Sequence, residues 1–125
     1  MAKKSIFIAF AVEDKTYRDF LVGQARHAKT PFDFVDMSVK EPWDAQWKTN
    51  CRSRVKGCDG VIALISKNTA GADGELWEIK CADDEAVPTM LMWINGDRPT
   101  LPASLRGRRV NIWSWDNLEA FVEKL

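Results

Sequence analysis

The sequence has few of the residues and motifs on which several common enzyme classes depend. It contains one histidine, His27, and three cysteines without CxxC spacing, Cys51, Cys58 and Cys81. A zinc site needs Cys and His at ligand spacing, and the sequence has none. A catalytic triad would have to use His27, which falls late in an expected helix and is interpreted as a surface or helix-end residue. We therefore expect neither a metal site nor histidine-based nucleophilic catalysis.

Other absences bound the partners and the location of the protein. No GxGxxG follows the first expected strand and no GxxxxGK[ST] occurs, so neither a Rossmann fingerprint nor a P-loop is supported. Lys plus Arg and Asp plus Glu number 18 each, which gives no reason to expect nucleic acid or an anionic membrane as partner. No apolar run is long enough to span a membrane or to form a good signal core. The odd number of cysteines suggests free thiols in a reducing compartment, so we expect a cytoplasmic protein.

What is present is the composition of one folded domain. The chain has 125 residues, of which 46% are hydrophobic and 29% charged, so residues 1–125 are expected to form a single domain with a real core. Six tryptophans are present. Most fall inside expected helices or strands and are interpreted as packing residues. Trp43 follows Pro42 in a loop, where its ring could serve a ligand.

Hydrophobic patterns predict strands and helices in alternation. Nearly continuous or alternating apolar runs predict strands at 5–11, 32–38, 60–66, 89–94 and 109–113. Helical spacing predicts helices from Glu13 to about residue 28, from an Asp44 cap to Gly57, over 75–86, and from an Asp116 or Asn117 cap to the end of the sequence. In the first of these helices, apolar residues follow at helical spacing: Tyr17, Phe20, Leu21, Ala25 and Ala28.

This alternation predicts an α/β fold with a parallel five-stranded sheet and helices on both faces. We expect the flavodoxin-like strand order 2-1-3-4-5. Ligands in such sheets bind beyond the carboxyl ends of the strands, next to the switch point between strands 1 and 3. The loops at that edge start at Ala11, Met37 and Lys67. A phosphoryl-accepting receiver domain has the same strand order but needs an acid at the end of strand 3, where this chain has Ser66.

Carboxylates are then the remaining candidates for chemistry at this edge. They are Glu13, Asp14, Asp36, Glu41, Asp73, Glu75 and Glu78. Glu13 and Asp14 are interpreted as helix-start residues, and Glu75 as an acid of the first helical turn. Asp36 ends the second strand and either touches a ligand or caps a turn. Glu78 differs, because it lies one turn into a packed helix between Trp77 and Ile79, where a half-buried carboxylate suits a functional role.

Three segments in register resemble TIR domains. The run SIFIAFAVEDKTYRDFL is similar to their first strand and helix, RSRVKGCDGVIALISKNT to their third strand, and LWEIKCA to the W…EI segment that follows. The similarity covers about residues 5–94. It is greatest to the short bacterial TIR-like family that contains the Thoeris ThsB-type defence proteins.

The resemblance implies a TIR-like fold and cleavage of the nicotinamide–ribose bond of NAD⁺, with release of a cyclic ADP-ribose-type messenger in antiphage signalling. The glutamate of the W…EI segment, Glu78 here, is implied as the catalytic residue, and NAD⁺ is a substrate, so no cofactor is expected. Phe10 and Ala11 match positions that line the nicotinamide pocket. The 37–47 segment matches the mobile BB loop, through which we expect self-association or contact with other TIR or effector proteins. Asp36, Trp43 and Ser66 complete the expected substrate-binding set.

One position departs from the family pattern. Many catalytic TIR domains carry Trp four residues before the glutamate, where this chain has Gly74. Trp77 lies about 100° round the helix from Glu78 and does not substitute for it. A ring could instead stack on Phe10 or Trp43, or the domain could be inactive. Two alternatives therefore stay open: a TIR-type interaction module without catalysis, and an enzyme like the nucleoside deoxyribosyltransferases, which also use a glutamate on this type of fold.

Overall fold

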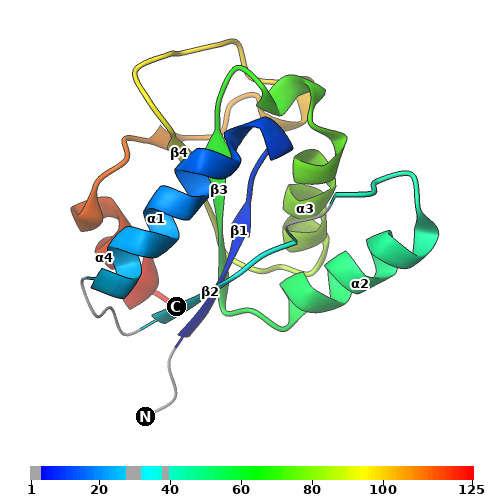
Figure 1. Cartoon of the computed structure of the whole chain (residues 1–125), viewed down its shortest axis with the longest axis horizontal. Helices are drawn as coiled ribbons and strands as arrows, with labels where there is room; N and C mark the ends of the chain where they lie inside the picture. The colour runs from blue at the N-terminus through cyan, green and yellow to red at the C-terminus, as the bar shows by residue number, and fades with distance from the viewer. Residues whose placement is uncertain (1–3, 28–31, 38–39) are drawn as a thin grey trace.

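A parallel five-stranded sheet forms the centre of the computed structural model, which describes residues 4–27, 32–37 and 40–125 (Figure 1). The strands lie in the order β2-β1-β3-β4-β5, and every neighbouring pair is parallel. The fold class and strand order predicted from the sequence are confirmed. The strands are β1 (Lys4–Ala9), β2 (Phe32–Val35), β3 (Gly60–Ile65), β4 (Thr89–Trp93) and β5 (Val110–Asn111).

Helices cover both faces of the sheet. They are η1 (Val12–Asp14), α1 (Lys15–His27), α2 (Ala45–Lys56), η2 (Thr69–Gly71), α3 (Asp73–Asp84), η3 (Ala103–Leu105) and α4 (Trp115–Glu123). Figure 1 shows α1 and α4 on one side of the sheet and α2 and α3 on the other. β3 is buried along its whole length because it lies in the middle of the sheet and is covered on both faces.

Two hydrophobic clusters follow from the alternation of side chains along the strands. Phe7, Ala63 and Leu91 face α2 and α3, and pack with Cys51 and Ile79 of those helices. The cluster on the opposite face is formed mainly by Ile6, Ile8, Phe10, Leu21, Ile62, Leu64, Met92 and Leu118. Successive residues of β1 and β3 therefore belong to opposite layers, and this alternation fixes the register of the central strands.

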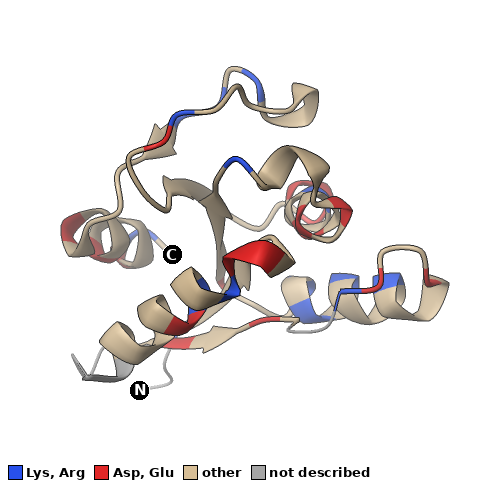
Figure 2. Cartoon of the chain, turned by 45° about the horizontal axis from the view of Figure 1, so that its top comes forward, with Lys and Arg blue, Asp and Glu red and all other residues tan. Residues whose placement is uncertain are grey.

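Charge also distinguishes the two helices on the α2–α3 side (Figure 2). α2 carries Lys48, Arg52, Arg54 and Lys56 and no acidic residue, whereas α3 carries five acids and one lysine. Arg52 forms ion pairs with Asp84 at 3.2 Å and Glu85 at 3.4 Å. These pairs join the two helices at the end of α3 that lies away from the carboxyl edge of the sheet.

Several boundaries differ from those predicted from the sequence. Glu13 and Asp14 form the separate turn η1 instead of the first turn of α1, and β5 contains only two residues. Asp44 caps α2 as predicted, because its side chain accepts a hydrogen bond from the Trp47 amide. The predicted cap of α4 was wrong, since Ser114 accepts from the Asn117 amide and fills that position.

The apolar residues at helical spacing in α1 are not all buried. Leu21 is fully buried, but the adjacent Phe20 is 62% exposed. Consecutive residues lie about 100° apart around a helix, so a single helix face that packs on the sheet through Leu21 leaves Phe20 outside. No helix within the described ranges is long and apolar enough to cross a membrane.

Candidate active site

Glu78 is the central residue of the candidate site. It lies on the sheet-facing side of α3 and is 0% exposed, so it is more deeply buried than its sequence context predicted. Its Oε2 atom accepts a hydrogen bond of 2.5 Å from the ammonium of Lys40, and the Lys40 side chain is itself only 4% exposed. Its Oε1 atom has no hydrogen-bond partner of normal geometry among the described residues. The Lys40 ammonium thus holds the carboxylate through one of its two oxygens.

The electrostatics of Glu78 are set by two opposing effects. Burial raises the pKa of Glu78 to about 8, while the charge and hydrogen bond of Lys40 and the backbone amide of Phe10 act to lower it. Nearby Asp36 raises this pKa further by like-charge repulsion. A buried carboxyl with a pKa near neutrality is a common property of catalytic groups, although structural ion pairs also perturb pKa values.

Phe10 provides an aromatic surface beside this carboxylate. It follows β1 directly, is buried, and its ring centroid lies 4.0 Å from the Lys40 ammonium. Arg18 lies 5.4 Å from the same ring and forms an ion pair of 3.3 Å with Asp36. Lys40 therefore lies against both an aromatic ring and a carboxylate, which is a favourable environment for a cation.

Gly74 leaves the space through which Lys40 reaches Glu78. A Cβ atom placed at residue 74 would lie 3.1 Å from the Cβ of Lys40 and 3.5 Å from its Cγ and Cδ. The lysine stem consequently packs against the bare backbone of the first turn of α3. The departure from the TIR pattern at Gly74 thus coincides with a lysine in the space above it.

A second group of buried polar residues lies at the same edge of the sheet. Asp14 is 2% exposed and accepts hydrogen bonds from the Ser66 hydroxyl at 2.5 Å and the Asn68 amide group at 2.8 Å. The Ser66 hydroxyl also accepts from the Asn68 backbone amide, and the Ser66 amide donates to the Thr69 hydroxyl. These bonds join the start of α1 to the loop after β3.

Glu75 is the third buried acid at this edge of the sheet. It is 1% exposed, and neither carboxyl oxygen has a hydrogen-bond partner of normal geometry among the described residues. Burial raises the pKa of Glu75 well above its usual value, the Thr69 hydroxyl lowers it, and the charges of Glu78 and Asp14 raise it again. The sequence placed Glu75 correctly in the first turn of a helix but gave no sign that this turn faces the interior.

The structure brings together some of the predicted site residues and separates others. Phe10 and Glu78 meet around Lys40, and Asp36 lies near enough to influence Glu78. Ala11 is buried, and its carbonyl accepts from the Asp14 amide. Ser66 binds Asp14 through its hydroxyl, so its observed contacts are structural.

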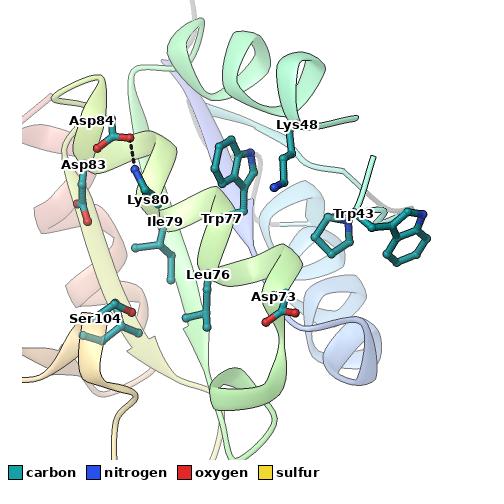
Figure 3. Close-up of a pocket in the computed structure, with 12 residues that line it drawn as sticks. Trp43, Lys48, Asp73, Leu76, Trp77, Ile79, Lys80, Asp83, Asp84 and Ser104 are labelled. Carbon is teal, nitrogen blue, oxygen red and sulfur yellow. Dashed lines mark hydrogen bonds and ion pairs between the residues drawn. The ribbon is translucent and has the colours of Figure 1, made fainter. Parts of the chain in front are cut away.

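Trp43 lies apart from these residues. It is 78% exposed and lines a groove of about 630 Å³ on the outer face of α3, together with Lys48, Trp77 and Lys80 (Figure 3). Glu78, Phe10 and Lys40 do not line this groove. The groove and the buried carboxylate lie on different faces of the same helix, and the burial of Glu78 shows that its own site is closed in this conformation.

Sequence reasoning missed Lys40, and it underestimated the burial of Asp14 and Glu75. Asp14 was interpreted as a helix-start residue, and it does precede α1, but its hydrogen bonds to Ser66 and Asn68 make it an interior residue. Lys40 falls in a charged loop sequence, VKEPW, where a lysine is ordinarily solvated. No local pattern could have indicated that its ammonium enters the interior.

Comparisons with known proteins agree with this architecture. No protein-family model matches the chain, and no curated protein sequence matches it. A prokaryotic SEFIR domain has a TM-score of 0.60 at 10% identity, over 98% of this chain and 95% of that chain. The fold is TIR-like. A 2-deoxyribosyltransferase from Bacillus psychrosaccharolyticus has a TM-score of 0.64 at 17% identity, over 92% of this chain and 90% of that chain. At such low identities both likenesses establish the fold alone.

The hydrogen bonds of Asp14 give a first testable prediction. Asp14→Ala removes the acceptor of two buried donors, so we expect a loss of about 1–3 kcal/mol in the free energy of unfolding. The matched control is Glu13→Ala, which truncates the exposed neighbouring acid and is expected to change stability by less than about 0.5 kcal/mol. Urea denaturation of the two variants measures the difference, and equal midpoints would contradict a structural role for Asp14.

Proposed function

We propose that this TIR-like domain cleaves the nicotinamide–ribose bond of NAD⁺, with Glu78 as the catalytic carboxylate. The observation that carries the proposal is the position of a cation, the Lys40 ammonium, between the Glu78 carboxylate and the Phe10 ring. The nicotinamide ring of NAD⁺ is itself positively charged, and the ribose acquires positive charge as the bond breaks. A site already arranged around a cation suits both states.

The reaction needs little assistance from the protein. The C1′–N1 bond breaks, its electron pair leaves with neutral nicotinamide, and the ribose becomes an oxocarbenium-like species. Water or a hydroxyl group of the substrate then adds to C1′ and loses one proton, which gives linear or cyclic ADP-ribose respectively. A fixed carboxylate stabilises the positive charge on the ribose, as in glycoside hydrolysis. Because nicotinamide leaves without protonation, one acidic residue is sufficient.

As part of the same proposal, the reaction takes place in the cytoplasm of bacteria and serves antiphage defence. A cyclic ADP-ribose-type product would activate an effector protein, and the segment from Lys40 to Trp47 would contact other copies or partners. The similarity of three sequence segments to the Thoeris ThsB-type proteins supports this setting.

A second candidate is transfer of a deoxyribosyl group between bases. The likeness to the 2-deoxyribosyltransferase favours it, and the chemistry also breaks an N-glycosidic bond. The bases of ordinary deoxynucleosides are neutral, however, and would not replace the charge of Lys40 beside Glu78. We therefore rank NAD⁺ first. A third candidate, a non-catalytic interaction module, is favoured by the closure of the site around Glu78.

Separate incubations with the two kinds of substrate distinguish the three candidates. Purified protein is incubated at matched concentrations with NAD⁺ alone, and with 2′-deoxyinosine plus free adenine, and released bases and new nucleosides are separated by chromatography. We expect nicotinamide release and no base exchange, with a ratio of at least about 100 between the two rates. Base exchange without nicotinamide release would establish the transferase instead. If the wild type and Lys40→Ala both leave the two substrates intact, the interaction module is the correct function.

A further inference from the structure

The position of Lys40 has a consequence for ligand binding. Its ammonium donates to Glu78 Oε2 at 2.5 Å and lies 4.0 Å from the centroid of the Phe10 ring. Both the lysine and the glutamate side chains are almost completely buried. No external molecule can reach this face of the carboxylate while the lysine is there. The pocket between Phe10, Gly74 and Glu78 is therefore already filled by a cation that belongs to the chain.

The lysine can leave this pocket without breaking a strand or helix. Lys40 lies between β2 and α2, four residues before the Asp44 cap. Its stem passes over Gly74, where no side chain interlocks with it. The ion pair and the ring contact are thus its main attachments to α3 and to the end of β1, and a second cation could replace both.

We propose that Lys40 is an internal competitor for a cation-selective pocket formed by Phe10, Gly74 and Glu78. A ligand enters only if it carries a positive ring that takes over the contacts of the ammonium with the carboxylate and the aromatic face. A neutral ring of the same shape is rejected, because it cannot replace the ion pair and the cation–ring contact that the Lys40 ammonium makes. This inference rests on the proposed function and extends it to a selection of oxidised over reduced nicotinamide.

Chemical labelling tests the competition directly. Brief acetylation with acetic anhydride, followed by mass spectrometry of peptides, reports how accessible each lysine is. In the free protein we expect Lys40 to react at least about 10-fold more slowly than Lys48, which lines the exposed groove on the outer face of α3. Saturating NAD⁺ should raise the rate at Lys40 by a similar factor, and NADH, which lacks the ring charge, should not. Glu78→Gln should raise it without any ligand.

A binding measurement with Lys40→Ala supports the labelling. Calorimetry should show NAD⁺ binding at least about 10-fold tighter in Lys40→Ala than in the wild type, because the competing ammonium is gone. The matched control Lys48→Ala removes a lysine of α2 that lines the groove on the outer face of α3, and it should bind as the wild type does. Affinity for NADH should change less than affinity for NAD⁺.

The outcomes separate this inference from the proposed reaction. Rapid labelling of Lys40 in the free protein, or equal NAD⁺ affinity in Lys40→Ala and the wild type, would overturn the proposal that Lys40 is an internal competitor. Displacement of Lys40 by NAD⁺ and not by NADH, without nicotinamide release from any variant, would support the competitor and contradict only the cleavage reaction.

Discussion

Glu78→Gln is expected to reduce nicotinamide release from NAD⁺ by about 10³-fold. The substitution keeps the size and packing of a side chain that is fully buried, but it removes the negative charge that would stabilise the developing oxocarbenium ion. Loss of one preorganised electrostatic contact commonly costs an enzyme a factor of this size. The rate is measured by chromatography of released nicotinamide at saturating NAD⁺.

A control variant and a folding check make this result interpretable. Glu85→Gln carries the same substitution at the far end of the same helix, where the side chain pairs with Arg52, and should retain the wild-type rate. The Glu78→Gln protein should also remain folded, as far-UV circular dichroism can verify. If this folded variant releases nicotinamide as fast as the wild type, the reaction does not use the buried carboxylate.

The stability of the protein should fall as pH rises from about 4.5 to about 8. Glu78 and Glu75 both have folded-state pKa values above the unfolded value of 4.5. The folded state therefore binds more protons than the unfolded state in this window. The stabilising contribution is complete below the unfolded pKa and is lost as pH rises through the folded pKa. Glu75 contributes in the same direction as Glu78, because burial raises both pKa values.

Glu75→Gln isolates the contribution of Glu75 to this effect. Neither oxygen of Glu75 has a hydrogen-bond partner of normal geometry in the described part of the chain, so a neutral amide fits where a charge would be costly. We expect Glu75→Gln to be more stable than the wild type at pH 8 by about 1–3 kcal/mol and similar at pH 4.5. Asp73→Asn, two residues earlier in the same helical turn, is the control and should keep the wild-type pH dependence. A Glu75→Gln profile parallel to the wild type would show that Glu75 is not the titrating group.

The sequence was sufficient to predict the sheet but not its outer edge. The run GVIALI is apolar throughout, and such a run in a chain of alternating elements identifies a central parallel strand. At the outer edge, Ile112 is 66% exposed and β5 is reduced to two residues. The predicted strand at 109–113 was too long, because local strand propensity does not show where the pairing with β4 ends.

The candidate site was predictable only in part, for a related reason. The position of Glu78 one turn into a helix at the carboxyl edge of the sheet follows from the order of elements, and so does the nearness of Phe10. Lys40, Gly74 and Glu78 interact across 38 residues of sequence, and no local pattern encodes such a contact. Trp43 shows the converse case, since an aromatic residue in the correct loop lies on the surface instead of over the carboxylate.

Nicotinamide release by Lys40→Ala and by the double variant Lys40→Ala/Glu78→Gln is the most direct test of the account. The first variant opens the pocket and the second also removes the carboxylate, so the pair isolates Glu78 in a site that NAD⁺ can enter. We expect Lys40→Ala to release nicotinamide at least as fast as the wild type and the double variant to be slower by about 10³-fold. Equal rates in the two variants, or no release from Lys40→Ala, would contradict the assignment of Glu78 as the catalytic carboxylate of an NAD⁺-cleaving domain.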